Sequence, residues 1–329
     1  MAWPYSLIAS EILRALRGRR SQRAFSKRLG YRSNIAYRWE SGRCFPSAAE
    51  ALTLIAKSGV DLPVILRRYL RAEPAWLVST AVATPAGVAT LLEELRGNTS
   101  VAELARRSTF NRYALARWFK GAAEPRLPEF LELVELTSYR MLDLVALLVN
   151  PERVPCIAKH WLRLEATREA AYTHPWSHAV LRALELEAYA ALGRHQQGWL
   201  ARRLSMPPAE EQHCLRLLHS AGQIQRRKGL WRVTDAGVID TRPDRERGRA
   251  LKSFWMRTAV ERFESGADGI FGYNLMALSA EDLPKLRELH IAYFQAMRNL
   301  VAESKPSEHV VLFCAQLFPL DSGGAVEKR

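Results

Sequence analysis

The feature that most constrains this fold is an internal repeat, because the sequence matches itself when it is shifted by 79 positions. The match runs without a gap over about thirty residues and includes turn residues and core aromatics. It pairs Gly18 with Gly97, Ser21 with Ser100, Tyr31 with Phe110, Arg38-Trp39 with Arg117-Trp118, Gly42 with Gly121 and Pro46 with Pro125. A shared pattern at a fixed offset indicates a duplicated unit, so residues 86–149 are predicted to repeat the fold of residues 1–71.

The first copy has the pattern of two short helices joined by a tight turn. Residues 22–29 form the first helix, and Gly30 ends it because glycine adopts a positive φ without steric cost. Ser33 is a suitable N-cap for a second helix over residues 34–40. This arrangement is typical of a helix-turn-helix, whose second helix enters the major groove of DNA.

Residues 8–70 resemble the Cro/CI-type repressor helix-turn-helix, through Gln22, the Gly30 turn, the helix over residues 34–40, Gly42 and Pro46. The resemblance implies double-stranded DNA as the partner, with Gln22 touching a phosphate. Arginine and asparagine suit this role because they form bidentate hydrogen bonds with guanine and adenine. The residues predicted to contact DNA are Gln22, Lys27, Arg28, Arg32, Ser33, Asn34, Tyr37, Arg38 and Arg43. The alternative is a helical hairpin with a basic, solvated face.

The distribution of charge agrees with a polyanionic partner. The chain has 48 Lys and Arg against 34 Asp and Glu, a net charge of +14. Residues 1–80 hold 14 basic and 5 acidic residues, and residues 194–252 hold 13 and 6. Residues 81–160 are nearly neutral, with 10 and 9. RNA and membrane surfaces also attract basic proteins, so charge alone does not select DNA.

The second copy departs from the first at two matched positions, where Val101 replaces Gln22 and Phe119 replaces Glu40. Arg112, Arg117 and Lys120 are predicted as secondary DNA contacts. The near-neutral surroundings equally suit a copy that keeps the scaffold for packing or dimerisation, and both roles stay open.

Residues 150–240 have the order of a winged helix, with helices followed by a hairpin around Gly229. Three basic residues at the tip of the wing, Arg226, Arg227 and Lys228, are predicted to add phosphate contacts. Glu210 and Glu211 begin the third helix and would repel phosphates. The module is therefore interpreted mainly as a packing or dimerisation unit.

Residues 241–320 are predicted to form a helix, a strand, a second helix and a second strand. The strand segments, Gly269–Leu278 and His309–Leu317, are apolar and rich in β-branched or aromatic residues. Two strands make a poor sheet alone, which suggests pairing with further strands, including those of a second subunit. Residues 86–320, which end in QLFPL, resemble an uncharacterised paralogous family of bacterial transcriptional regulators. In that family a single helix-turn-helix stands where this chain has its second copy.

No catalytic, metal or cofactor motif emerges from the sequence. The chain lacks a Walker P-loop, a GxGxxG after a strand, an HExxH and a GxSxG. The cysteines, Cys44, Cys156, Cys214 and Cys314, are scattered and form no CxxC pair. No apolar run approaches a membrane span, and no leader sequence is evident. We therefore expect a cytoplasmic protein that is not an enzyme, with no cofactor, no metal and no membrane partner.

The sequence thus predicts a mainly α protein with tandem helix-turn-helix domains, a winged-helix-like module and a small C-terminal α/β unit. The predicted division is 1–71 helix-turn-helix, 72–85 linker, 86–149 second helix-turn-helix, 150–240 winged-helix-like, 241–320 dimerisation or effector domain and 321–329 tail. The expected function is that of a sequence-specific transcriptional regulator, acting as a homodimer and controlled by an unidentified effector or protein partner. The alternative is a protein-interaction scaffold or a peptide or ligand sensor with only non-specific DNA affinity.

Overall fold

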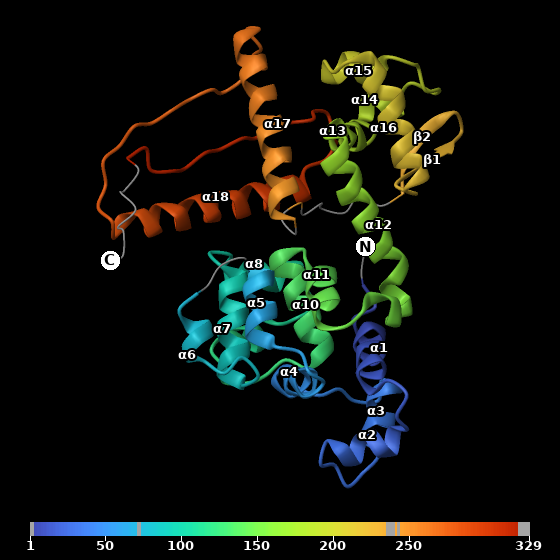
Figure 1. The fold of residues 1–329 in the computed structure, drawn as a ribbon, viewed down its shortest axis with the longest axis vertical. Coiled ribbons are helices and arrows are strands. Elements are labelled where there is room, and N and C mark those ends of the chain that lie inside the picture. Colours follow the sequence, from blue (N-terminus) through green and yellow to red (C-terminus); the bar gives the residue numbers. More distant parts are fainter. Residues whose placement is uncertain (1–2, 71–73, 235–240, 242–243, 322–329) are drawn as a thin grey trace. The chain divides into compact units, whose positions relative to one another are not determined.

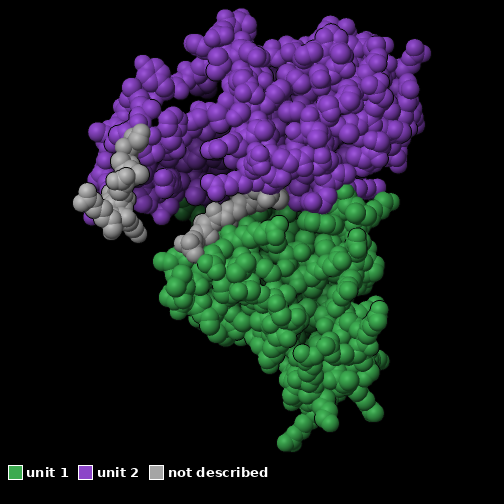
Figure 2. Space-filling model, in the orientation of Figure 1, with its two compact units in different colours: residues 1–162 green, residues 163–329 purple. Residues whose placement is uncertain are grey.

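The computed structural model describes residues 3–70, 74–234, 241 and 244–321. Over these ranges the chain is mainly helical and has one two-stranded sheet, which confirms the predicted mainly α class (Figure 1). The chain divides into two compact units, residues 1–162 and 163–329 (Figure 2). None of the described helices is long and apolar enough to cross a membrane.

The first copy of the repeat folds into five helices. They are α1 (Tyr5–Arg17), α2 (Gln22–Arg28), α3 (Ile35–Glu40), α4 (Ala48–Lys57) and α5 (Leu62–Leu70). Serine side chains cap two of them, since Ser21 accepts a hydrogen bond from the Ala24 amide at 3.2 Å and Ser47 accepts one from the Glu50 amide at 3.3 Å. Gly30 ends the α2 segment with a φ of 88°.

Each of these helices has a counterpart 79 residues later, after a single turn of helix, α6 (Trp76–Ser79). The counterparts are α7 (Pro85–Arg96), α8 (Val101–Arg107), α9 (Arg112–Phe119), α10 (Leu127–Ser138) and α11 (Met141–Leu148). The local packing is also repeated. Tyr31 meets Trp39 edge to face at 5.5 Å, and Phe110 meets Trp118 in the same way at 5.1 Å.

A single apolar core runs through both copies. Helices of both copies contribute fully buried side chains to it, among them Ile8, Trp39, Leu52, Leu91 and Phe130. The 3-10 turn Pro151–Arg153 follows α11 and leads into α12 (Pro155–Thr173). The helical pattern of the repeat therefore builds one shared body within residues 1–162.

The second unit contains the predicted order of helices and hairpin. Its elements are α13 (Trp176–Ala183), α14 (Glu187–Ala190), α15 (Trp199–Leu204), α16 (Pro208–Ser220), β1 (Ile224–Arg227) and β2 (Leu230–Val233). The strands are antiparallel, and Gln225 pairs with Arg232. Lys228 and Gly229 connect them with φ angles of 47° and 80°, the positive values that a tight two-residue hairpin turn requires.

The C-terminal region forms two long helices, α17 (Arg245–Glu264) and α18 (Asp282–Glu303). The strands predicted at Gly269–Leu278 and His309–Leu317 are not present, because within the described residues neither segment pairs through its backbone with another strand. Both segments are extended and largely exposed, as Tyr273 and Val311 illustrate at 88% and 80%. Composition suited to a strand does not form one without a neighbouring strand.

We expect the stability of the protein to decrease as the pH falls from 6.5 to 4, because of His178 in α13. Burial and the nearby positive charge of Arg182 lower the pKa of His178 to about 4. The unfolded chain therefore binds a proton in this range that the folded chain does not bind. The contribution of neutral His178 to the free energy of unfolding is fully present above pH 6.5. About 1–3 kcal/mol of this free energy is lost by pH 4.

Urea unfolding at pH 7.0, 5.5 and 4.5 tests this expectation. Carboxylates also titrate in acid, so the quantity to compare is the change with pH in the wild type against that in His178→Gln. The variant should show a weaker pH dependence. Parallel curves for the two proteins would contradict the assignment to His178.

Candidate nucleic-acid interface

Most of the residues predicted to contact DNA are exposed on the first helix-turn-helix, although Arg28 lines a hollow beside Leu54 and Lys57 of α4. The exposed members of the set are Lys27, Arg28, Arg32, Ser33, Tyr37, Arg38 and Arg43. Asn34 and Gln22 are partly buried. Lys27 and Arg28 end α2, whereas Tyr37 and Arg38 belong to α3. The basic groups therefore come from both helices and from the turn between them.

The burial of α3 explains which way this surface faces. Ala36, Trp39 and Glu40 are buried, so the opposite face presents Tyr37 and Arg38 to solvent. The Arg43 guanidinium lies 5.2 Å from the centre of the Tyr37 ring. This cation–π contact joins the turn after α3 to the helix and sets a positive charge beside its exposed face.

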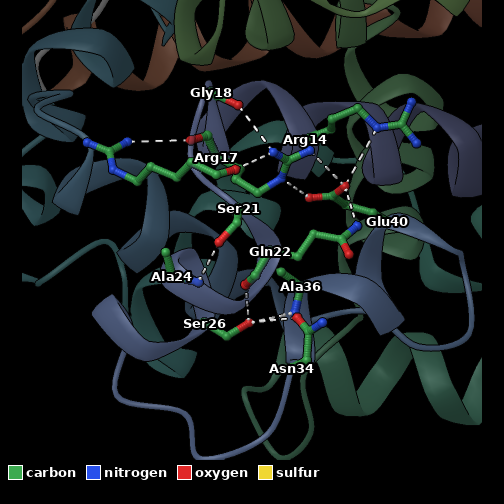
Figure 3. Close-up of polar contacts among 11 residues, drawn as sticks. Arg14, Arg17, Gly18, Ser21, Gln22, Ala24, Ser26, Asn34, Ala36 and Glu40 are labelled. Atoms are coloured by element: carbon green, nitrogen blue, oxygen red, sulfur yellow. Dashed lines mark hydrogen bonds and ion pairs between the residues drawn. The ribbon is translucent and has the colours of Figure 1, made fainter.

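Ser26 fixes α3 against α2 (Figure 3). Its buried hydroxyl donates to the Gln22 carbonyl at 2.8 Å and accepts from the Ala36 amide at 3.1 Å. The prediction that Ser33 caps α3 is wrong, because Asn34 holds the N-cap position and makes no side-chain cap bond. The Ser26 hydroxyl, coming from the neighbouring helix, satisfies the amide that a local cap would otherwise bind.

A second polar cluster surrounds the carboxylate of Glu40, the last residue of α3. Arg17 Nε donates to Glu40 Oε1 at 2.5 Å and Gln22 Nε2 donates to Oε2 at 2.9 Å (Figure 3). Arg14 lies 3.7 Å from the same carboxylate, whose side chain is only 5% exposed. The bond with Glu40 raises the pKa of Arg17. Gln22 therefore donates one amide hydrogen to Glu40 within the protein. Its second amide hydrogen is the one that would be donated to a phosphate.

The second copy replaces Gln22 and Glu40 of this cluster with apolar residues, and its arginine pairs instead with Glu93, the counterpart of Arg14. Arg96, the counterpart of Arg17, lies 5.2 Å over the ring of Phe119, the counterpart of Glu40. Val101 stands where the first copy has Gln22. The contacts of Glu40 with Arg17 and Gln22 were not predicted from the sequence. The joint replacement of Gln22 and Glu40 in the repeat was a signal that these two side chains touch.

The second copy also presents a basic outer face. Asn111 caps α9 by accepting from the Ala114 amide at 2.8 Å. Arg112, Tyr113, Arg117 and Lys120 are exposed, and Arg117 stacks 5.7 Å over the Tyr113 ring. The three predicted secondary contacts in this copy therefore come together on one face of α9.

The wing exposes Arg226, Arg227 and Lys228, as its sequence suggests. The interpretation of the acidic pair at the start of α16 needs correction. Glu211 is 1% exposed and accepts from the amides of Gly198 and Ala201, at 2.9 and 2.7 Å. Its charge is used to bind the first amides of α15, and so it does not face a phosphate backbone.

Among known protein families, residues 158–320 match the model of a domain of unknown function (DUF4423). This match covers the winged-helix-like module, α17 and α18, and it ends before the tail. The tandem helix-turn-helix region lies outside it. Neither the curated proteins nor the solved structures contain a match to the chain.

Proposed function

We propose that this protein is a sequence-specific DNA-binding transcriptional regulator that reads bases with α3. The observation that carries the proposal is the exposed basic face around α3, backed by the buried contacts of Ser26 and Glu40 that hold the helix in place. A reading helix must be positioned precisely to reach base edges, and these contacts supply that precision.

The chemistry of individual residues supports distinct roles. Arg38 is exposed on α3 and suits a bidentate contact with guanine. Asn34 makes no cap bond to α3 and its Oδ1 lies 3.4 Å from the Ser26 hydroxyl, so its amide nitrogen is the group left to donate to a base edge. Lys27, Arg28 and Arg43 surround these groups and suit phosphate contacts, with the wing residues adding to affinity. Such a protein would work in the cytoplasm and requires no cofactor, metal or catalytic group.

The first prediction concerns the Arg32→Ala/Asn34→Ala/Arg38→Ala variant. We expect the wild type to enrich one shared motif from sheared genomic DNA at near-physiological salt, and the variant to lose the preference that α3 contributes to it. Lys252→Ala/Arg257→Ala is the matched control, because it also removes two positive charges, but from exposed positions of α17. A motif that survives unchanged in the α3 variant would exclude α3 as the reader.

The alternative function is a protein-interaction scaffold or a ligand sensor with non-specific DNA affinity. The scaffold function is favoured by α18, because no residue of this helix is buried and its surface is open to a protein partner. Salt separates the two functions, since binding through several phosphates weakens steeply with salt whereas an apolar protein interface does not. Absence of an enriched motif together with steep salt dependence would indicate non-specific affinity alone.

We also propose that the regulator is a homodimer held together by its C-terminal region, where an effector or partner would act. The extended segments offer unpaired strand edges, and a second copy would supply matching ones. Between Ile270 and Leu320, 17 large apolar side chains are exposed. If each lost about 50 Å², the area would reach the roughly 800 Å² per partner of a stable interface.

Leu300→Glu/Val301→Glu should therefore convert a dimer into a monomer, because it places two charges on an apolar face of α18 that is about 70% exposed. Sedimentation velocity at micromolar concentration measures the change. Val78→Glu is the control, since Val78 is equally exposed but lies in α6. A wild type that sediments as a monomer would rule out this dimer.

A further inference from the structure

The two copies of the repeat are joined by a reciprocal pair of backbone hydrogen bonds. The Ala48 amide donates to the Pro125 carbonyl at 2.9 Å, and the Leu127 amide donates to the Pro46 carbonyl at 3.0 Å. Between these bonds Ser47 faces Arg126 in an antiparallel bridge. Residues 46–48 and 125–127 are equivalent at the offset of 79. Equivalent segments that give each other the same bond form the pattern that a two-fold axis produces.

The helices on either side of this bridge also pack across the two copies in equivalent pairs. In the first copy α1 packs against α10, which is the counterpart of α4, and α4 packs against α7, which is the counterpart of α1. The equivalent helices α5 and α11 pack against each other. The exchange is not complete, since α10 also packs against α7, α8 and α11 of its own copy. The two copies are thus interlocked about a pseudo-two-fold axis.

Named side chains secure this interlock on both sides. The Tyr69 hydroxyl of α5 lies 2.9 Å from Ser138 Oγ, and Arg140 donates to the Tyr69 carbonyl at 2.9 Å. At the bridge the Arg126 guanidinium of the second copy donates to the Phe45 carbonyl of the first at 3.3 Å. Because these bonds join one shared core, the helix pairs α2–α3 and α8–α9 are held in fixed relation within one chain.

Three acidic residues of the second copy accept hydrogen bonds from backbone amides of the helix starts. Glu124 accepts from the Ala49 amide at 3.4 Å, Glu129 accepts from the Arg126 amide at 2.6 Å, and Glu135 accepts from the Met141 amide at 3.1 Å. These carboxylates serve the interlock and the helix starts. The near-neutral charge of residues 81–160 therefore does not disqualify the exposed Arg112 and Arg117 from contacting DNA.

We propose that a single chain acts as an internal pseudo-dimer, in which α3 and α9 read two inverted half-sites of unlike sequence in one DNA duplex. This inference rests on the proposed function and adds its substrate class, an imperfect inverted repeat. Arg38 and Arg117 are equivalent, so both halves share one guanine preference. Asn34 is replaced by Tyr113 and Tyr37 by Ala116, so the remaining preferences differ.

The test compares Arg38→Ala with Arg117→Ala in selection from random duplex DNA, followed by titration of the wild-type motif. Both arginines are exposed, so neither substitution disturbs the core. We expect a bipartite motif in which each variant erases the preference in a different half, with affinity reduced about 5- to 100-fold. Tyr113→Ala should alter only the half that depends on Arg117. Arg257→Ala, which removes an exposed arginine of α17 outside both helix pairs, is the control.

The outcomes separate the two proposals. If Arg38→Ala changes both halves and Arg117→Ala neither, two chains read with α3, and the internal pseudo-dimer is wrong while the regulator remains. A motif with only one half has the same consequence. If the wild type selects no motif, the proposed function fails and this inference fails with it.

Discussion

Replacing Glu40 with alanine is expected to destabilise the protein by about 3 kcal/mol and to reduce specific DNA binding as well. The carboxylate is 5% exposed and holds Arg17 at 2.5 Å and Gln22 at 2.9 Å. Its removal leaves the guanidinium of Arg17, itself 18% exposed, without this partner. Breaking a buried ion pair by removing one partner costs about 3–5 kcal/mol, and the remaining exposure of Arg17 favours the lower end.

The second copy supplies the matched control for this prediction. There Arg96 lies over the Phe119 ring and pairs with Glu93, the counterpart of Arg14, and valine stands in place of glutamine. The triple variant Arg14→Glu/Gln22→Val/Glu40→Phe transfers that arrangement to the first copy. It should recover much of the stability that Glu40→Ala loses, because Arg17 regains a partner and no buried polar group is left alone. Urea unfolding measures the free energy of unfolding of the three proteins. A value for the alanine variant within about 0.5 kcal/mol of the wild type would contradict the prediction.

The helices of the tandem repeat were predictable from the sequence, but the interlock was not. Turn residues and core aromatics recur at one offset, so the helical pattern of the first copy specifies that of the second. Periodicity identifies the apolar face of α4 without saying whether that face meets α1 or α7. Both partners are helices of the same kind, and the choice depends on packing that only the fold displays.

A similar division holds for the candidate site and the C-terminal region. The exposed basic residues of α3 were predictable because helical spacing opposes them to Trp39. Ser26 and Glu40 were missed because their partners lie on other helices, and single-helix patterns do not report such contacts. The predicted strands Gly269–Leu278 and His309–Leu317 are extended chain in the structure. A strand depends on a partner as well as on its own residues, and no strand of this chain provides one within the described ranges.

Arg140 provides the second prediction of large effect, because it joins the two copies at their axis. Its guanidinium donates to the Tyr69 carbonyl at 2.9 Å, lies 4.5 Å over the Tyr69 ring and comes within 3.8 Å of Asp143. Tyr69 is fully buried. Arg140→Met should destabilise the protein by about 3 kcal/mol, since it removes a charged partner from the buried Asp143 and a donor from the Tyr69 carbonyl.

The consequence should extend to both copies, because these contacts link α5 of the first copy to α11 of the second. We expect circular dichroism during urea unfolding to show residues 1–162 lose their helices in one transition, shifted to lower urea in Arg140→Met. Arg153→Met makes the same chemical change at an exposed position and should shift the midpoint little. A variant in which one copy melts first while the other keeps its helices would mean that the copies are independent domains. In that case the two reading helices would not be held in fixed relation, and the internal pseudo-dimer would lose its physical basis.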